Sequence, residues 1–413
     1  MLPSDVPTTG AAAAPAAAKP RVWIEELRLT NFRNYPNLAL ASGPRPIVLT
    51  GPNGSGKTNL LEAASLLTSG QGLRRAPYPE LTRVGAVDWA VAATVQTRLG
   101  RTRIGTGLQL QQADGARSGR SVRIDGENQS GSGALADLID ILWLTPAMDG
   151  LFTGPAAERR RFLDRVIPSF DPGYRLRLGQ FERAMQQRNR LLAEDVREPA
   201  RFTGLERIMA ETGVAIAAAR AAAVGELATI VAARRAAAPE GAFPWAALSI
   251  TGALEAELAT RPAVDVEDAY AALLESVRER DRAAGRALDG PHRSDLVVGH
   301  GPKGMPAATC STGEQKALLV GLVLAHADMI RQHRNGAAPI LLLDEISAHL
   351  DPVRRAALFA EIVALGNQTW MTGTDAEAFS GLAGTAQFHR VEGGRIAASP
   401  EPPGSFQHRA ITN

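Results

Sequence analysis

The clearest chemical motif in this sequence of 413 residues is a glycine-rich run that ends in a lysine and a threonine, GPNGSGKT, from Gly51 to Thr58. It fits the pattern G-x-x-x-x-G-K-[ST], in which backbone N–H groups surround the β- and γ-phosphates of a nucleoside triphosphate. Lys57 would add a positive charge, and the Thr58 hydroxyl could bind Mg²⁺. A chance glycine-rich turn is disfavoured because a strand pattern precedes the run and a helical pattern follows it. The expected nucleotide-binding residues are Gly51, Pro52, Asn53, Gly54, Ser55, Gly56, Lys57, Thr58 and Asn59.

Two adjacent acidic residues follow a second apolar run, APILLLDEIS, which starts at Ala338. Ligands of open α/β sheets gather at the carboxyl ends of the strands, where Asp344 and Glu345 would lie. Asp344 is then suited to hold Mg²⁺ through water, and Glu345 to polarise the attacking water. The pair could instead form a solvated strand end or a helix cap. The predicted catalytic residues are Lys57 and Glu345, and the predicted metal ligands are Thr58 and Asp344.

A third motif, CSTGEQKALLVGLVLAHAD, starts at Cys310 and leads into a strongly apolar helical pattern. Ser311, Thr312 and Gly313 would stand at the start of this helix, where free backbone N–H groups favour an anion. Because Glu314 lies three residues after Ser311, a capping box would explain the serine without any function. Both interpretations stay open at this point.

An α/β domain must position these motifs. Residues 22–32 alternate as a strand does, and Arg45–Thr50 has the pattern of a short buried strand. Short alternating runs in Val87–Ile124 are separated by turn residues, which predicts an antiparallel meander. Further strand patterns are DLVVGH, APILLLDE and QTWMTG, and FHRVEGGRI predicts a hairpin.

A helical segment of roughly 130 residues interrupts this domain. Its composition is mostly Ala, Arg, Leu and Glu, and long helices are predicted at Tyr174–Leu192, Leu205–Ala236 and Val266–Ala284. The predicted division is a disordered tail at 1–20, the first part of an ATPase lobe at 21–154, a helical lobe at 155–285, and the rest of the ATPase lobe at 286–413.

The composition indicates a soluble protein of a reducing compartment. The apolar fraction is 45% and the net charge is +2, but 41 of the 45 basic residues are arginines, which bind phosphate bidentately. A single cysteine, Cys310, excludes an internal disulfide and a cysteine-based metal cluster. No stretch is expected to approach the roughly 18 apolar residues of a membrane span, and the first 20 residues do not resemble a signal peptide.

The order of the motifs resembles a known class. A P-loop, a long insertion, S-x-G-E-Q before a helix and an acidic strand end are similar to the ATP-binding-cassette heads of the SMC class, which have a mixed sheet and an antiparallel β subregion. Within that class the chain resembles the RecF family in four segments: LRLTNFRNY, GPAAERRRFLDRV, LDGPHRSDL and STGEQKALL. The short helical insertion also resembles that family, and the resemblance runs from Val22 to about Ile396.

This resemblance implies ATP and Mg²⁺ as cofactors and an ATP-dependent homodimer that closes as a clamp on duplex or gapped DNA. Slow, DNA-stimulated ATP hydrolysis would reset the clamp. The implied context is cytoplasmic, with no membrane: gap repair, replication-fork maintenance and SOS induction with RecR, RecO and the RecA pathway. Arg33 would approach the nucleotide, and Asp351 would lie in the aspartate loop. The residues that would contact the partner copy's ATP are Ser311, Thr312, Gly313, Glu314 and Gln315.

Four positions depart from the pattern of the class. The segment before the arginine cluster carries only Asp149, and Ser294 stands where an acid is expected. No switch histidine follows QTWM, so Thr372 or Thr374 would have to sense the γ-phosphate. A glutamine for the metal-sensing loop is not evident either.

Arginines are concentrated between Glu158 and Arg190, where nine stand against four acidic residues. Such a segment could neutralise DNA phosphates without regard to base sequence. A solvated helix face with internal Arg–Glu pairs is the alternative. The DNA-binding candidates are Arg159, Arg160, Arg161, Arg74 and Arg75.

Three rival functions share some of these motifs. A transporter ATPase subunit would have the P-loop and the acidic strand end, but no long helical insertion. A cassette-superfamily nuclease would need a further acidic metal cluster. A purely structural DNA-binding protein would bind DNA without ATP.

Overall fold

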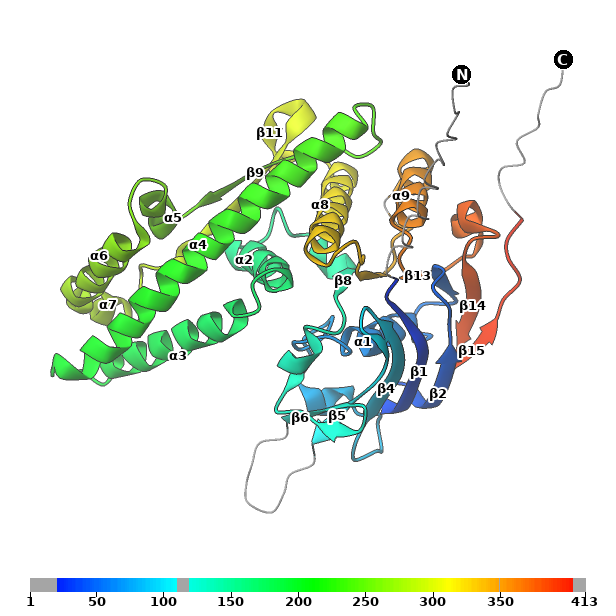
Figure 1. The fold of residues 1–413 in the computed structure, drawn as a ribbon, viewed down its shortest axis with the longest axis horizontal. Helices are drawn as coiled ribbons and strands as arrows, with labels where there is room; N and C mark the ends of the chain where they lie inside the picture. Colours follow the sequence, from blue (N-terminus) through cyan, green and yellow to red (C-terminus); the bar gives the residue numbers. More distant parts are fainter. Residues whose placement is uncertain (1–20, 110–118, 349, 404–413) are drawn as a thin grey trace, which may run out of the picture.

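The computed structural model describes residues 21–109, 119–348 and 350–403, so the predicted tail at 1–20 lies outside the described residues. Two six-stranded sheets form one end of the molecule, and long helices project from it at the other end (Figure 1). Helix α1 shares a hydrophobic core with strands of both sheets. The helices of the sheet-containing end are α1 (Lys57–Ser65), α8 (Thr312–His333) and α9 (Pro352–Leu365).

The first sheet carries the nucleotide-binding motifs. Its order is β15-β14-β3-β13-β12-β8, and every neighbouring pair is parallel except β14 with β15, which form the predicted hairpin. The carboxyl ends of β3, β12 and β13 therefore meet at one edge. The strands are β3 (Ile47–Thr50), β8 (Ile141–Leu144), β12 (Ile340–Leu343), β13 (Thr369–Gly373), β14 (Gln387–Glu392) and β15 (Arg395–Ala398).

Both faces of the sheet are buried at the central strands β3 and β12, which explains why the sequences of these two strands are almost entirely apolar. In β12, Ile340 and Leu342 belong to the core shared with α1 and the second sheet. Leu341 and Leu343 belong to the core on the opposite face, which includes α8. The continuous run ILLL is thus a central strand, as predicted.

The second sheet is antiparallel, in the order β2-β1-β4-β5-β6-β7. Its strands β4, β5 and β6 confirm the predicted meander, and β1 confirms the strand predicted at 22–32. The strands are β1 (Trp23–Phe32), β2 (Tyr35–Ala41), β4 (Ala90–Thr97), β5 (Gly100–Gln109), β6 (Gly119–Ile124) and β7 (Glu127–Asn128).

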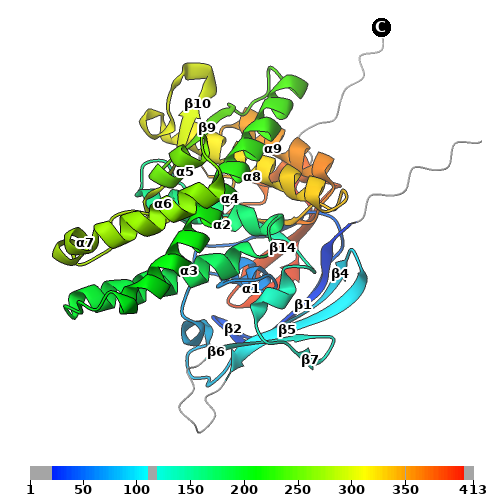
Figure 2. The ribbon, with the colours of Figure 1, turned by 60° about the vertical axis from the view of Figure 1, so that its left-hand side comes forward.

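The inserted segment is helical, as expected, and its two longest helices, α3 and α4, run side by side (Figures 1 and 2). Their apolar faces form a separate core with α6 around Tyr174, Phe181 and Tyr270. The helices are α2 (Ala156–Val166), α3 (Tyr174–Ala193), α4 (Ala200–Ala237), α5 (Ala253–Leu258), α6 (Ala263–Ser276) and α7 (Arg278–Ala284).

One helix prediction was wrong. The helix predicted over Val266–Ala284 is broken at Val277, whose dihedral angles (φ −98°, ψ 9°) leave the helical range. The break separates α6 from α7 and lets polar groups of α7 reach α3 and α4. This break is accompanied by ion pairs between segments that are distant in the sequence. Local periodicity does not reveal such pairs.

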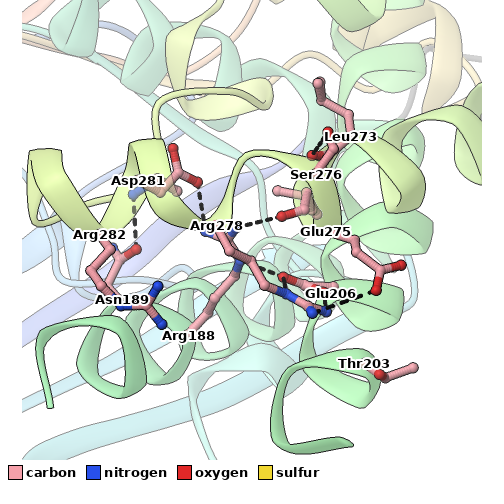
Figure 3. A network of polar contacts seen from close by, with 12 residues as sticks. Arg188, Asn189, Thr203, Glu206, Leu273, Glu275, Ser276, Arg278, Asp281 and Arg282 are labelled. Atoms are coloured by element: carbon pink, nitrogen blue, oxygen red, sulfur yellow. Dashed lines mark hydrogen bonds and ion pairs between the residues drawn. The ribbon is translucent and has the colours of Figure 1, made fainter. Parts of the chain in front are cut away.

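These ion pairs form a buried network in the helical region (Figure 3). The guanidinium of Arg188 is fully buried and donates to Glu206 of α4 (3.0 Å), to Asp281 of α7 (2.7 Å) and to the backbone carbonyl of Leu274 (2.7 Å). Arg278 also pairs with Glu206. In the sequence Arg188 was counted within the arginine-rich segment; in the structure it is an internal link between the four helices α3, α4, α6 and α7.

The expectation that no stretch is apolar enough to cross a membrane was wrong, because helix α4 is one. Among the described residues it is the one helix that passes by length and composition, with a mean hydropathy of 1.7 over its most apolar window. Half of that window is buried inside the protein, against α3, α6 and α8. Its apolar residues therefore have a packing role in the fold.

A small third sheet, β11-β10-β9, lies beside α4. Strand β10, from the predicted run DLVVGH, pairs with β9 of the inserted segment and not with either large sheet. The division of the chain at residues 154 and 285 therefore stays a prediction, and this pairing favours a later second boundary. The strands are β9 (Ala246–Thr251), β10 (Asp295–His300) and β11 (Met305–Pro306).

Candidate functional site

The glycine-rich loop connects central strand β3 to the first turn of α1, as the sequence predicts. Gly51 has a positive φ of 146°, and a Cβ there would lie 2.2 Å from the carbonyl oxygen of Val391 in β14. Only glycine fits so close to the neighbouring strand. From Gly51 the loop continues to the N-terminus of α1, where backbone N–H groups favour an anion.

Lys57 lies inside this loop. The residue is 5% exposed, and its ammonium group donates to the carbonyl oxygens of Gly51 (2.7 Å) and Pro52 (2.9 Å). Burial lowers the pKa of Lys57, and the carboxylates of Glu345 and Asp344 partly offset this effect. The lysine is thus held where a triphosphate would lie, with both predicted acids close enough to affect it.

Residues that sequence analysis did not single out support the loop from the β1–β2 turn. The amide of Asn34 donates to the carbonyl oxygen of Ser55 (3.1 Å), and the Tyr35 hydroxyl donates to that of Gly56 (3.1 Å). Asn59 of α1 donates to the Asn34 side chain (2.8 Å). In the sequence, Asn34 and Tyr35 were marked only by their place in the NFRNY segment, because their contacts join segments about 20 residues apart.

Thr58 and Asp344 meet at the carboxyl edge of the sheet. The Thr58 hydroxyl donates to the two carboxylate oxygens of Asp344 at 2.9 and 3.1 Å. A hydroxyl and a carboxylate at this separation are hard oxygen donors of the kind that bind Mg²⁺ together with phosphate and water. The described residues contain no cluster of three or more His, Cys, Asp or Glu suited to a metal.

Thr372 connects the two acids. Its buried hydroxyl donates to Asp344 Oδ1 (2.8 Å) and accepts the backbone N–H of Glu345 (2.8 Å). Glu345 has a positive φ of 48°, a conformation that costs a non-glycine residue energy and must be held by its surroundings. Thr372 was predicted to sense the γ-phosphate; its observed bonds favour a positioning role instead.

We expect Thr372→Val to lower the kcat of ATP hydrolysis about 10- to 100-fold, because a hydrogen bond to a charged group contributes about 1.5–3 kcal/mol. ATP affinity should change little, since no atom of Thr372 belongs to the loop. Thr372→Ser keeps the hydroxyl and should restore most of the rate. Steady-state turnover and nucleotide titrations would test this, and a fully active valine variant would remove Thr372 from the account.

The third motif forms the N-terminus of α8. Ser311 and Glu314 make a capping box, with bonds of 3.4 and 3.1 Å, so the structural interpretation of this serine is correct. Ser311 and Thr312 are also exposed at the surface. Gln315 is buried and donates to the carbonyl oxygen of Cys310 (2.8 Å), so it faces away from that surface.

The aspartate loop adjoins this motif. Asp351 caps α9 by accepting the N–H of Arg354 (2.9 Å), and the Arg354 guanidinium donates to the carbonyl oxygen of Gly313 (3.4 Å). Arg354 was missed in the sequence because nothing local marks it. Thr374, the second candidate sensor, is exposed just beyond β13. Among the described residues, no hydrogen bond or ion pair joins this group to the glycine-rich loop.

Comparisons with known proteins agree with this arrangement. The family model described as the RecF/RecN/SMC N-terminal domain matches residues 23–390. The RecF protein of Mesorhizobium japonicum is 52% identical over 92% of this chain and 98% of its own length. That of Agrobacterium fabrum is 52% identical over 92% and 99%. The chain belongs to the RecF family.

Solved structures match the fold of this RecF-family chain. The recombination mediator protein RecF of the RecFOR pathway aligns in its ATPrS form with a TM-score of 0.80 at 19% identity, over 93% of this chain and 100% of that one. Its ATP form gives 0.79 at 19% identity, over 93% and 99%. An SMC head from Pyrococcus furiosus gives 0.51 at 15% identity, over 92% and 96%. The predicted head fold with a helical insertion is confirmed.

The structure assigns several arginines of this RecF-family chain to internal ion pairs. Arg33 makes a two-pronged pair with the buried Glu62 of α1 at 2.8 Å for each bond. Arg74 joins the same carboxylate (3.1 Å) and also donates to Asn59 (2.8 Å). Arg33 therefore contacts the helix that begins at Lys57, and its approach to a nucleotide stays a prediction.

Most arginines of the predicted basic cluster on α2 also make contacts within the chain. Arg159 pairs with Asp295 through two bonds (2.7 and 2.8 Å), and Arg160 donates to the carbonyl oxygen of Ser294 (2.7 Å). Arg161 is partly exposed and pairs with Glu158 (2.8 Å). Arg159 and Arg160 therefore hold α2 against β10 and are poor candidates for DNA contacts.

Two departures from the family pattern have structural explanations. Ser294 donates to Glu255 of α5 (2.5 Å), so a carboxylate from another segment lies beside the position where an acid was expected. Asp149 pairs with the buried Lys316 of α8 (2.6 Å). Asp149, the one acid before the arginine cluster, thus links its segment to α8, the helix of the third motif.

We also expect the folded protein to lose stability in acid, because His326 of α8 is buried. Burial, and next the charge of Arg165, lowers the pKa of His326 from 6.5 to about 3. Between these values the unfolded chain binds a proton that the folded chain does not, so stability falls as pH falls. The free energy of unfolding, measured with urea, should fall by roughly 2 kcal/mol between pH 6.5 and 5 because of this histidine. His326→Leu should flatten this dependence; an unchanged slope would contradict it.

Proposed function

We propose that this RecF-family chain is an ATP-dependent DNA-binding ATPase of replication and repair that closes on DNA as a dimer. The observation that carries the proposal is the division of the site within one chain. Lys57, Thr58, Asp344 and Glu345 gather at one sheet edge, and no hydrogen bond or ion pair among the described residues joins them to the exposed start of α8 at Ser311. A second copy would complete each site by placing its α8 N-terminus on the γ-phosphate.

Each catalytic side chain has a proposed part in hydrolysis. Lys57 would exchange its bonds to loop carbonyl oxygens for bonds to the β- and γ-phosphates. Thr58 and Asp344 would hold Mg²⁺, which supplies positive charge beside the phosphates. Glu345 would take a proton from the attacking water while Thr372 fixes its backbone.

The energies suit a clamp that opens and closes. Each sandwiched γ-phosphate would add charge-assisted hydrogen bonds of about 1.5–3 kcal/mol. Two sites together would strengthen dimerisation by roughly 10²- to 10⁴-fold, since about 1.4 kcal/mol is a factor of ten. Loss of both phosphates would then release a weak dimer without unfolding either subunit.

The biological setting follows from the relatives. The curated relatives are named DNA replication and repair proteins, and the solved RecF structures are placed in the RecFOR pathway. For this chain we propose recombinational gap repair, fork maintenance and SOS induction on duplex and gapped DNA, in the cytoplasm, with RecR, RecO and the RecA pathway as partners. Hydrolysis would be slow and stimulated by DNA.

Fluorescence anisotropy of a labelled duplex would test this function. We expect tight binding with ATP and Mg²⁺, weak binding with ADP, and a steep salt dependence. Lys57→Ala should bind DNA weakly under both conditions. Equal binding with ATP, with ADP and without nucleotide would favour a purely structural DNA-binding protein, and Mg²⁺-dependent cleavage of plasmid DNA would favour a nuclease.

A further inference from the structure

A lysine from the small third sheet lies beside the start of α8. Lys303 ends the short 3-10 helix η6 (Gly301–Lys303) between β10 and β11, and its ammonium group contacts the carboxylate of Glu314 at 2.6 Å. Glu314 belongs to the first turn of α8 and lies three residues after Ser311. The third sheet and the third motif are thus joined at the surface that we propose meets a second copy.

The inserted segment holds the hairpin that carries Lys303. The backbone N–H of Gly301 donates to the carbonyl oxygen of Trp245 (3.0 Å), and a Cβ at Gly301 would lie 2.2 Å from the Trp245 ring. The backbone N–H of Lys303 donates to Nδ1 of buried His300 (3.3 Å). The backbone of Lys303 is therefore held in place, while its side chain remains 47% exposed.

The carboxylate of Glu314 lies where the N-terminus of α8 would otherwise attract an anion. One of its oxygens accepts the backbone N–H of Ser311 (3.1 Å), and the other contacts Lys303. Lys303, and next the hydrogen bonds of Ser311, lower the pKa of Glu314 to about 2, so this carboxylate is charged throughout the physiological range. A phosphate brought to Ser311 would therefore meet a negative charge close by, which opposes its approach.

The other ions near the start of α8 balance one another. Arg354 pairs with Asp351 (3.6 Å) and also donates to the carbonyl oxygen of Gly313 (3.4 Å). Within the part of the chain that the structure describes, Lys303 and Glu314 form ion pairs only with each other. Removal of Lys303 would thus leave a net negative charge where the γ-phosphate held by a second copy must arrive, and like charges across an interface oppose association.

We propose that Lys303 is a positioning residue for ATP sandwiched between two copies: by neutralising Glu314, it lets the γ-phosphate held by one copy approach Ser311 of the other. Lys303 acts through Glu314 and needs no contact with the phosphate. The inference rests on the proposed dimer and adds a residue outside the three motifs on which ATP-dependent association depends. The alternative is an ion pair that only supports the hairpin, as many surface pairs do.

The test measures the dissociation constant of the dimer by sedimentation velocity with ATP and Mg²⁺. Every variant is made in the Glu345→Gln protein, which serves as the reference, so that ATP persists. We expect Lys303→Ala to weaken the dimer about 10- to 100-fold, because the carboxylate then opposes the phosphate. Lys303→Arg keeps the charge and should restore most of the affinity. Lys303→Ala/Glu314→Gln should dimerise nearly as the reference does, since glutamine is uncharged and can still accept the Ser311 N–H.

Two controls exclude indirect effects. Arg190→Ala removes an exposed cation that pairs with Glu194 in the helical segment, and it should leave the dissociation constant of the dimer unchanged. ATP affinity, titrated at concentrations where every protein is monomeric, should be equal in all variants. Equal affinities would show that none of the changes has unfolded the nucleotide-binding loop.

The outcomes bear on different claims. If the reference dimerises with ATP and Lys303→Ala dimerises equally well, the role of Lys303 is refuted alone. If Lys303→Ala/Glu314→Gln is as weak as Lys303→Ala, Lys303 is a structural link, and the charge argument is overturned. If the reference stays monomeric with ATP, the proposed dimer fails, and this inference fails with it.

Discussion

Replacing Glu345 with glutamine is expected to lower ATP turnover by about 10²- to 10⁴-fold, the usual contribution of a positioned general base. ATP affinity should stay close to that of wild type, because Lys57 and Thr58 keep their contacts with the loop and with Asp344. The amide preserves the size of the side chain and removes its ability to take a proton. Single-turnover hydrolysis and equilibrium ATP binding would separate these two effects.

Glu377→Gln is the matched control for this change, since Glu377 is an exposed acid beyond the end of β13. It should hydrolyse ATP at the wild-type rate. A Glu345→Gln variant that hydrolyses ATP as fast as wild type would show that another group activates the water. The carboxyl edge of the sheet would then hold the nucleotide without supplying the base.

The second large effect is expected in stability. Arg188→Ala should lower the free energy of unfolding by about 3–5 kcal/mol, because it leaves Glu206 and Asp281 as buried charges without their shared partner. The loss should appear first in the helical segment, where these residues tie α3, α4 and α7 together (Figure 3). Urea unfolding followed by circular dichroism would measure it.

Arg190→Ala serves as the control here too, since Arg190 lies two residues away and is exposed. Its effect should stay within about 0.5 kcal/mol. If Arg188→Ala were equally mild, the buried network would be dispensable for the fold. The break at Val277 would then need another explanation than the ion pairs of α7.

Local patterns were sufficient where function depends on consecutive residues. The glycine-rich loop, the acids after β12 and the cap of α8 each lie within one short segment, and their placement followed from strand and helix periodicity. The meander and the final hairpin were also predictable, because alternation and turn residues are local signals.

Contacts between distant segments were not predictable in this way. Thr372 reaches Asp344 across 28 positions, and Asn34 reaches Ser55 across 21, so only the folded chain identifies them as supports of the site. The arginines show the same limit. Counting them between Glu158 and Arg190 could not separate buried Arg188 from unpaired Arg175, since helical periodicity alone does not tell which carboxylates come near.

The molecular mass of the Glu345→Gln variant in solution tests the central claim most directly. Light scattering with ATP and with ADP, each with and without duplex DNA, would show whether the triphosphate joins two copies. We predict a dimer with ATP that DNA reinforces, and a monomer with ADP. A variant that binds ATP yet remains monomeric under all four conditions would contradict the sandwiched dimer, and with it the clamp.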